Sequence, residues 1–228
     1  LCCQAGADAD ACMNCRAHCH QGTYHTGEAL VQIAQRGQGM QTFEQAPALG
    51  TEAFRRWLGQ SIVVGEKGEP LVVYHGTKGN FAFFDPAWSG GTDPGWFGKG
   101  FYLTPDPEMA SEYAGLSKPG GNVMPVFVKA ENPMVVKVVE GKGSEDLFIE
   151  KVAEVSGRPI EDVDLMEPEE WTALVIAAGH DGVIIDRKAV GEPGEIIVFA
   201  STQIKSLFNP GTWDPNDPRV LDERESSV

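Results

Sequence analysis

The chain has 228 residues, of which 42% are hydrophobic, and a formal net charge of −15. This length and composition predict one medium-sized globular domain, or one domain with an extension. The acidity disfavours binding to nucleic acid by general attraction to phosphates, and the lack of an apolar run of about 18 residues disfavours a membrane span.

All the cysteines lie near the beginning of the chain, at Cys2, Cys3, Cys12, Cys15 and Cys19. Because a disulfide-stapled fold distributes its cysteines through the domain, and no leader is evident, we expect an intracellular protein. Thiolates and imidazoles spaced like Cys12, Cys15, Cys19 and His20 are able to bind zinc. A structural zinc site normally pairs two ligand clusters across a loop, so we expect an irregular tail here and keep zinc binding as the alternative.

The first predicted elements precede and open the globular domain. Residues 28–37 predict a short helix, and residues 1–50 together are expected to form an extension and linker that is poorly ordered at its start. Thr51 is a suitable N-cap for a helix over Glu52–Leu58. Two apolar runs, Ser61–Val64 and Leu71–His75, flank a turn-like segment and predict a β-hairpin.

A long loop separates the next predicted strands. Phe81–Asp85 predicts a strand, and the glycine-rich segment Pro86–Lys99 follows it. Loops of this length are uncommon unless they serve a function. Phe101–Leu103 predicts another short strand, and Pro107 stands at a first-turn position of a helix that runs to about Leu116.

The second half of the chain predicts more strands with a few helices inserted between them. The strands are Val123–Ala130, Met134–Val139, Gly182–Asp186, Glu195–Ala200 and Ile204–Phe208, and the helices are Ser144–Val155 and Glu167–Ala178, the latter ending at Gly179. The tail from Asn209 is rich in proline and aspartate and is expected to be irregular. Because strands and helices do not alternate regularly, the sequence predicts an α+β fold with antiparallel sheets.

Four short motifs stand in order at the edges of these elements. They are Tyr74-His75-Gly76-Thr77, Gly98-Lys99-Gly100-Phe101-Tyr102-Leu103, Ala110-Ser111-Glu112-Tyr113 and Gly194-Glu195-Ile196-Ile197. Each alone has an ordinary structural explanation, such as a core aromatic residue or a solvated carboxylate, and Gly98-Lys99-Gly100 lacks the full spacing of a phosphate-binding loop. Their combination and order are more informative than any one of them.

Together the motifs resemble the ADP-ribosyltransferase fold, in the branch of poly(ADP-ribose) polymerases and diphtheria toxin, which carries histidine, tyrosine and glutamate on three successive sheet elements. From about Gly50 the chain is more closely similar to the ADP-ribosyltransferase domains of phage polyvalent proteins. The further matching segments are Arg55-Arg56-Trp57-Leu58-Gly59, Gly179-His180-Asp181-Gly182-Val183-Ile184 and Phe208-Asn209-Pro210-Gly211-Thr212-Trp213-Asp214-Pro215. The resemblance implies two packed, mainly antiparallel sheets with a few flanking helices, and a catalytic domain over residues 51–215 followed by a tail over residues 216–228.

The resemblance also implies that NAD is a consumed substrate, with Glu195, His75 and Tyr102 as the catalytic residues. His75 would hydrogen-bond a ribose hydroxyl, and the backbone of Gly76 would hold the nicotinamide amide. Tyr102 and Tyr113 would sandwich the nicotinamide ring, because two aromatic faces suit a flat, positively charged ring. Glu195 would bind the ribose 2′-hydroxyl and stabilise the oxocarbenium-like centre that forms as nicotinamide leaves.

Further NAD contacts are expected around this centre. Thr77 lies two residues after the histidine and is a candidate NAD contact. Many family members carry a serine where this chain has Ala110, so Ser111 is a candidate replacement. The segment Pro86–Lys99 corresponds to a flap over NAD, in which Trp96 and Phe97 would close over the adenosine. Lys99 is a candidate for the pyrophosphate, with a solvated lysine as the equal alternative.

The leading hypothesis is therefore mono-ADP-ribosyl transfer from NAD to a macromolecular acceptor, with release of nicotinamide and no metal in catalysis. Relatives that modify arginine carry a carboxylate or amide two residues before the catalytic glutamate, where this chain has Pro193, so the resemblance disfavours an arginine acceptor. We expect a host protein rather than a nucleic acid. The phage resemblance implies the cytoplasm of a bacterial host, with delivery alongside phage DNA as one route. The alternatives are a catalytically inactive module that binds NAD or a partner, and an RNA 2′-phosphotransferase-like reaction, which the scarcity of basic residues disfavours.

Overall fold

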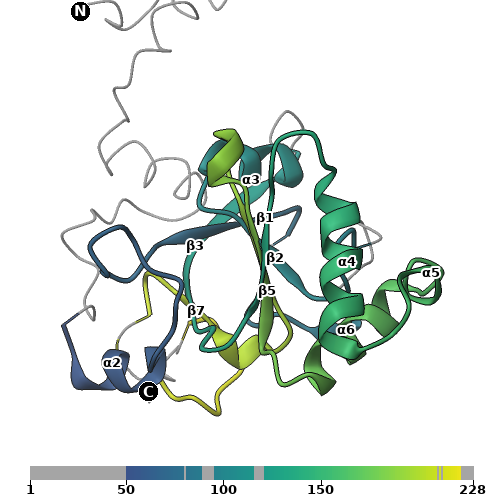
Figure 1. Cartoon of the computed structure of the whole chain (residues 1–228). Coiled ribbons are helices and arrows are strands. Elements are labelled where there is room, and N and C mark those ends of the chain that lie inside the picture. Colours follow the sequence, from purple (N-terminus) through teal and green to yellow (C-terminus); the bar gives the residue numbers. More distant parts are fainter. Residues whose placement is uncertain are drawn as a thin grey trace, which may run out of the picture. The chain divides into compact units, whose positions relative to one another are not determined.

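The structure is a computed structural model, and it describes residues 50–79, 81–88, 95–115, 121–209, 211 and 213–221. Over these residues the chain forms two sheets flanked by helices (Figure 1), which are labelled here as in the figure. The predicted helix over residues 28–37 and the zinc candidates Cys12, Cys15, Cys19 and His20 lie outside the described residues.

Helix α2 (Glu52–Leu58) forms where the sequence predicts a helix. The hydroxyl oxygen of Thr51 accepts a hydrogen bond from the backbone N–H of Phe54 at 3.1 Å, which satisfies one of the free donors of the first turn. Phe54 and Trp57 are both 1% exposed and pack against the ring of Trp213 near the other end of the domain. This contact attaches the first helix to the C-terminal segment.

The first sheet has three antiparallel strands in the order β1-β3-β7. They are β1 (Val73–Thr77), β3 (Asn122–Val128) and β7 (Ile204–Ser206). His75 of β1 lies opposite Met124 of β3, and the strand order places β1 at the edge of this sheet.

The second sheet has four strands in the order β2-β6-β5-β4. They are β2 (Phe101–Leu103), β6 (Glu195–Val198), β5 (Gly182–Asp186) and β4 (Met134–Lys137), of which only the β4–β5 pair is parallel. Both sheets are thus mainly antiparallel, which confirms the predicted α+β fold with two packed sheets.

Two hydrophobic cores lie on opposite faces of the four-stranded sheet. The core between the two sheets contains Val73, Val126, Phe101, Ile196, Val198 and Ile204, among others. The other face packs against helices α4 (Ser144–Ser156) and α6 (Pro168–Ala177), which lie side by side in Figure 1, through Ile185, Ile197, Phe148, Trp171 and Val175. Burying each such side chain contributes about 1.5–3 kcal/mol to folding.

The remaining helical elements are short. Helix α3 (Pro107–Ala114) packs on β1 and ends at Gly115, close to the predicted end near Leu116. Helix α5 (Ile160–Val163) was not predicted, because a single turn leaves no periodic pattern in a sequence. Single 3-10 turns occur at η3 (Pro86–Trp88), η4 (Lys188–Val190) and η5 (Ser201–Gln203).

Two predicted strands, Ser61–Val64 and Phe81–Asp85, are not formed. The hairpin of Ser61–Val64 with Leu71–His75 is reduced to a single bridge between Val64 and Pro70, because proline lacks the N–H that would extend the ladder. The segment Phe81–Asp85 makes one bridge, from Phe83 to Arg219. Its last residue, Asp85, accepts a hydrogen bond from the N–H of Ala87 and begins the η3 turn instead.

The C-terminal segment over residues 213–221 contains no helix or strand, as predicted for a tail of this composition. It nevertheless packs on the domain beyond residue 215. Val220 is 1% exposed, its N–H donates to the carbonyl of Ala82, and its own carbonyl accepts from the N–H of Ser206. The buried ammonium of Lys205 donates to the carbonyl oxygens of Asp217 and Arg219 at 2.6 and 2.8 Å.

In the part of the chain that the structure describes, no helix has both the length and the apolar character needed to cross a membrane.

Candidate active site

Glu195 is the first residue of β6 and is 7% exposed. It lies opposite Ile185 on β5 and alternates with Ile197, so its side chain is on the face of the sheet that α4 and α6 cover. The carbonyl of the preceding residue, Gly194, accepts a hydrogen bond from the hydroxyl of Thr104 at 3.1 Å. The backbone of the glutamate is therefore held from β5 on one side and from the end of β2 on the other.

The carboxylate of Glu195 is paired with a guanidinium group. Nη2 of Arg187 lies 3.0 Å from Oε2 of Glu195, and the two side chains are 18% and 9% exposed. Nη1 of Arg187 lies 3.6 Å from a carboxylate oxygen of Glu192, which is 62% exposed. The turn between β5 and β6 thus brings one buried and one exposed carboxylate to the same arginine.

His75 is partly buried on β1 and is oriented by the backbone of β2. Its Nδ1 lies 2.8 Å from the carbonyl oxygen of Tyr102, and its ring packs edge-on against Phe84 at 4.8 Å between ring centroids. Burial lowers the pKa of His75 below its ordinary value, against a smaller upward effect of the hydrogen bond to Tyr102. A carbonyl only accepts, so Nδ1 carries the proton and the neutral ring presents Nε2 as an acceptor.

One backbone bridge joins the two sheets beside the histidine. Tyr74 and Thr104 exchange both N–H to carbonyl hydrogen bonds, at 2.8 and 3.0 Å. The bridge is isolated and does not extend into a ladder between β1 and β2, and the side chain of His75 makes the next connection, to Tyr102. The predicted histidine and tyrosine elements are thereby brought together.

Tyr102 is partly buried and anchors the end of the glycine-rich loop. Its hydroxyl donates to the carbonyl of Gly98 at 2.6 Å and accepts from the N–H of Phe97 at 3.0 Å. Gly100 lies so close to β6 that a Cβ there would be 2.5 Å from the side chain of Ile197. Close packing against β6 therefore explains the glycine at position 100.

Helix α3 packs directly on the strand that carries the histidine. A Cβ at Gly76 would collide with the carbonyl oxygen of Ala110, and would lie 2.9 Å from the backbone nitrogen of Ala114. Tyr113 on the same helix is 54% exposed, so about half of its surface is accessible to solvent. The hydroxyl of Ser111 donates to the carbonyl of Pro107 at 2.8 Å, which leaves its oxygen lone pairs, and not its proton, for a ligand.

Of the other residues predicted to contact NAD, some have accessible side chains and others are buried or already paired. Trp96 is 54% exposed, whereas Phe97, expected beside it over the adenosine, is 4% exposed and packs against Phe148 in the core. The ammonium of Lys99 lies 3.1 Å from a carboxylate oxygen of Glu169 on α6, so this lysine is paired in the structure. The hydroxyl of Thr77, at the end of β1, accepts from the N–H of Gly79 at 3.3 Å.

The structure thus joins His75 to Tyr102 directly. Glu195 begins the strand that pairs with β2, and the residue before it, Gly194, is bonded to Thr104 just after β2. Arg187 was not identified from the sequence as part of this site. The available signal was the short turn between the strands that end at Asp186 and begin at Glu195, because a hairpin brings residues on its two sides together.

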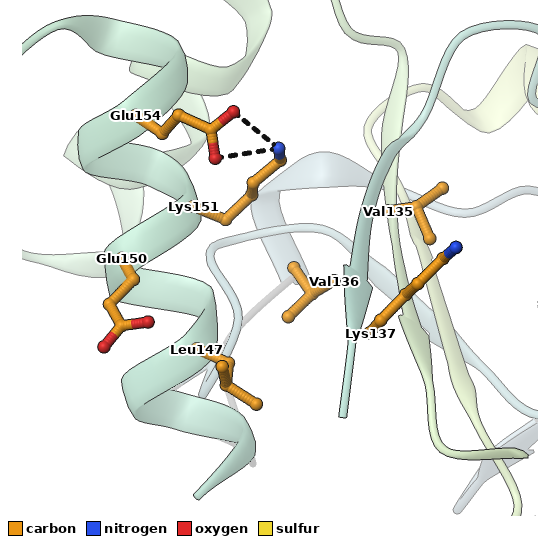
Figure 2. A pocket seen from close by; sticks show the side chains of 7 residues that line it. All are labelled: Val135, Val136, Lys137, Leu147, Glu150, Lys151 and Glu154. Carbon is orange, nitrogen blue, oxygen red and sulfur yellow. Dashed lines mark hydrogen bonds and ion pairs between the residues drawn. The ribbon is translucent and has the colours of Figure 1, made fainter. Parts of the chain in front are cut away.

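A metal cluster and a surface groove are the other features that could mark a ligand site. Among the described residues no group of three or more histidine, cysteine, aspartate or glutamate side chains is arranged to hold a metal. A groove of about 370 Å³ lies between β4 and α4, and Figure 2 shows its lining by Val135, Val136, Lys137, Leu147, Glu150, Lys151 and Glu154. Lys151 is paired within this groove with Glu154 at 2.9 Å, and the groove shares no residue with the site around Glu195.

Comparison with known proteins identifies the family of the chain. The family model of ADP-ribosyltransferases in polyvalent proteins matches residues 65–213, which is well over half of the chain and includes His75, Tyr102, Tyr113 and Glu195. No curated protein and no solved structure matches the chain significantly. The family match agrees with the two mainly antiparallel sheets and with the order of the motifs along the chain, and the chain therefore belongs to the family of ADP-ribosyltransferase domains found in polyvalent proteins.

Proposed function

We propose that this domain cleaves the bond between nicotinamide and ribose in NAD and transfers a single ADP-ribose unit to a macromolecular acceptor. The bond from C1′ to the nicotinamide nitrogen breaks, and its electron pair leaves with the now neutral nicotinamide. A nucleophile of the acceptor forms the new bond to C1′ and releases its proton to solvent. Membership of the family supports ADP-ribosyl transfer in general.

The observation that carries the proposal is the buried carboxylate of Glu195 at the start of β6, beside the strand that receives the hydrogen bond of His75. A fixed negative charge in a water-poor site stabilises a developing positive charge more than a mobile, solvated one does. Glu195 would accept a hydrogen bond from the 2′-hydroxyl of the nicotinamide ribose and stabilise positive charge at C1′.

His75 would bind the ribose from the opposite side. Its Nδ1 donates to the carbonyl of Tyr102, and burial lowers its pKa, so the ring is neutral at neutral pH. Neutral Nε2 accepts a hydrogen bond from a hydroxyl, which a protonated ring does not. This tautomer suits a ribose hydroxyl and requires no rearrangement of the ring.

The nicotinamide ring would lie between Tyr102 and Tyr113, with its amide on the backbone of Gly76. The half-exposed ring of Tyr113 and the contact between Gly76 and α3 support this assignment, because a flat cation is attracted to aromatic faces. Trp96, 54% exposed, would cover the adenosine, while Thr77, Ala110, Ser111 and Lys99 border the NAD site as secondary candidates.

We propose that the acceptor is a host protein and that the domain acts in the cytoplasm of a bacterial host. The net charge of −15 supports this choice over a nucleic acid, because like charges oppose the approach of phosphates. Pro193, where arginine-modifying relatives carry a carboxylate or amide, supports an acceptor other than arginine.

The test is nicotinamide release from NAD by the purified domain, compared between the wild type and Glu195→Gln. The substitution keeps the size of the side chain and removes its charge, so we expect a loss of roughly 10²–10³-fold in kcat. Glu154→Gln is the matched control, since Glu154 also pairs with a cation but lies on α4.

Release by Glu195→Gln at the wild-type rate would overturn the assignment of Glu195. Binding of NAD in a calorimetric titration without any release, even with lysate proteins added as acceptors, would favour the inactive NAD-binding module instead.

A further inference from the structure

Arg187 connects the proposed catalytic carboxylate to the base of the glycine-rich loop. It follows the last residue of β5, and its side chain is 18% exposed. The guanidinium carbon lies 6.0 Å from the centroid of the Phe97 ring, while Nη2 lies 3.0 Å from Glu195. Phe97 in turn donates its N–H to the hydroxyl of Tyr102. One side chain thus contacts both the glutamate and a residue that Tyr102 holds.

The pair between Arg187 and Glu195 is poorly explained as a device for stability. A buried ion pair loses much of its Coulombic gain to desolvation and often contributes little to folding. Nε of Arg187 is buried and makes no hydrogen bond within the described part of the chain, which adds to the desolvation cost. The geometry is therefore better explained by what the arginine does to the glutamate.

The arginine constrains the glutamate at one oxygen. The hydrogen bond is made to Oε2 of Glu195, and a carboxylate held at one oxygen presents the other in a defined direction. Arg187 has a second ion-pair contact, to the exposed Glu192 at 3.6 Å. A fixed carboxylate has less orientational freedom to lose when the substrate reaches its transition state.

We propose that Arg187 is a positioning residue for Glu195. It holds Oε2 so that Oε1 faces the ribose, and its contact with Phe97 makes this orientation depend on the anchored end of the glycine-rich loop. The inference rests on the proposed function, because it assigns a role relative to the ribose of NAD. It also predicts a kinetic signature: the carboxylate orientation affects the reaction step more than the binding of NAD.

The experiment compares Arg187→Met and Arg187→Lys with the wild type in steady-state nicotinamide release. We expect Arg187→Met to lower kcat by roughly 10- to 100-fold with KM for NAD changed by less than about twofold, because misplaced catalytic groups affect the transition state selectively. Lysine supplies one donor to Oε2 and is expected to recover part of this loss. Arg56→Met is the matched control, because Arg56 pairs with Glu52 at 2.7 Å on the surface of α2.

A double-mutant cycle with Glu195→Gln separates positioning from general damage. If Arg187 acts through Glu195, then Arg187→Met adds little further loss in the Glu195→Gln background, since residues that act as a unit are not additive. Thermal melting of each variant reports whether the fold is intact. Equal additional losses in both backgrounds would overturn the proposal.

Other outcomes also decide the question. An unchanged kcat in Arg187→Met, or a rise in KM alone, would overturn positioning, the latter in favour of direct NAD binding by the arginine. A rise in kcat would overturn it in favour of a latch that blocks Glu195. If the wild type neither releases nicotinamide nor binds NAD, the proposed function fails and this inference fails with it. That outcome differs from failure of the positioning role alone, in which the wild type is active.

Discussion

Nδ1 of His75 lies 2.8 Å from the carbonyl oxygen of Tyr102, so a side chain of one sheet is hydrogen-bonded to the backbone of the other. This bond sets the tautomer of the imidazole and joins β1 to β2 just beyond the bridge between Tyr74 and Thr104. It makes the histidine both a connection between the sheets and an oriented acceptor, and the first prediction follows from this arrangement.

NAD binding is expected to weaken in acid through protonation of His75. Burial lowers the pKa of this ring below 6.5, so the neutral form persists through neutral pH, and affinity should fall only at pH values below that point. The same shift makes folding stability full above pH 6.5 and progressively lower as pH falls from 6.5 through the folded pKa, because the unfolded chain takes up the proton first. Calorimetric titration with NAD across roughly pH 5–8, the range in which histidine titrates, measures the binding effect.

His75→Asn is the companion variant for this acid limb. Its amide N–H is able to replace the Nδ1 donor, but the variant has no Nε2 acceptor, and loss of one such hydrogen bond weakens binding by roughly 10-fold. The NAD affinity of His75→Asn should therefore lack the fall at acidic pH that we expect for the wild type. An identical limb in His75→Asn would assign the titration to another group.

Tyr102→Phe should destabilise the domain although it removes one atom. The hydroxyl serves the carbonyl of Gly98 and the N–H of Phe97, and both would lose a partner in a half-buried position. Leaving such groups unsatisfied costs about 1–3 kcal/mol. Urea unfolding measures the change, and a variant as stable as the wild type would show that water replaces the hydroxyl.

Tyr113→Ala should affect NAD binding more than folding stability. Because its ring is 54% exposed, its removal is expected to change unfolding midpoints little. Loss of one stacking face should raise KM for NAD by roughly 3- to 10-fold, since aromatic pairing contributes about 0.5–1.5 kcal/mol. Tyr113→Phe keeps the ring and should retain the wild-type KM; a raised KM in Tyr113→Phe would instead assign the effect to the hydroxyl.

Gly76→Ala tests the contact between β1 and α3. The new methyl group would meet the backbone of Ala110 and Ala114, which cannot move without shifting the helix, so we expect a loss of about 1–3 kcal/mol in unfolding free energy. Gly79→Ala is the matched control two residues after the end of β1, because nothing lies within 4 Å of a Cβ there. Equal stabilities of the two variants in urea would contradict the close approach of α3.

We expect a second loss of folding stability, at more acidic pH, that originates in the C-terminal segment. The side chain of Arg219 lowers the pKa of Asp217 from 3.8 to about 2. A depressed carboxyl pKa contributes stability that is complete above the unfolded value of 3.8 and is lost as pH falls through about 2. Asp217→Asn should therefore be less stable than the wild type at neutral pH, and this difference should disappear between about pH 4 and pH 2.

Chemical unfolding at several pH values measures this difference between Asp217→Asn and the wild type. Asp214→Asn is the control, because Asp214 is exposed and its carboxylate accepts a bond from the backbone N–H of Asn216, which an amide oxygen also accepts. A difference between Asp217→Asn and the wild type that persists below the folded pKa of about 2 would show that the aspartate acts through packing instead of its charge.

The sequence by itself determined the elements whose signals are local, together with the order of the motifs. Thr51 and Pro107 each mark a helix start, and strands such as Phe101–Leu103 are short β-prone runs, so side-chain chemistry within a few residues decided them. The family also followed from the sequence, because the order of His75, Tyr102 and Glu195 is a property of the chain.

Only the tertiary structure decided which side chains face one another. The bond from His75 to Tyr102 spans 27 positions in the chain, and the pairing of Arg187 with Glu195 depends on how tightly β5 and β6 are joined. Phe97 is buried and Lys99 is paired because α4 and α6 cover that face of the sheet. Burial and partnership are set by packing between distant segments, and no local pattern of residues encodes them.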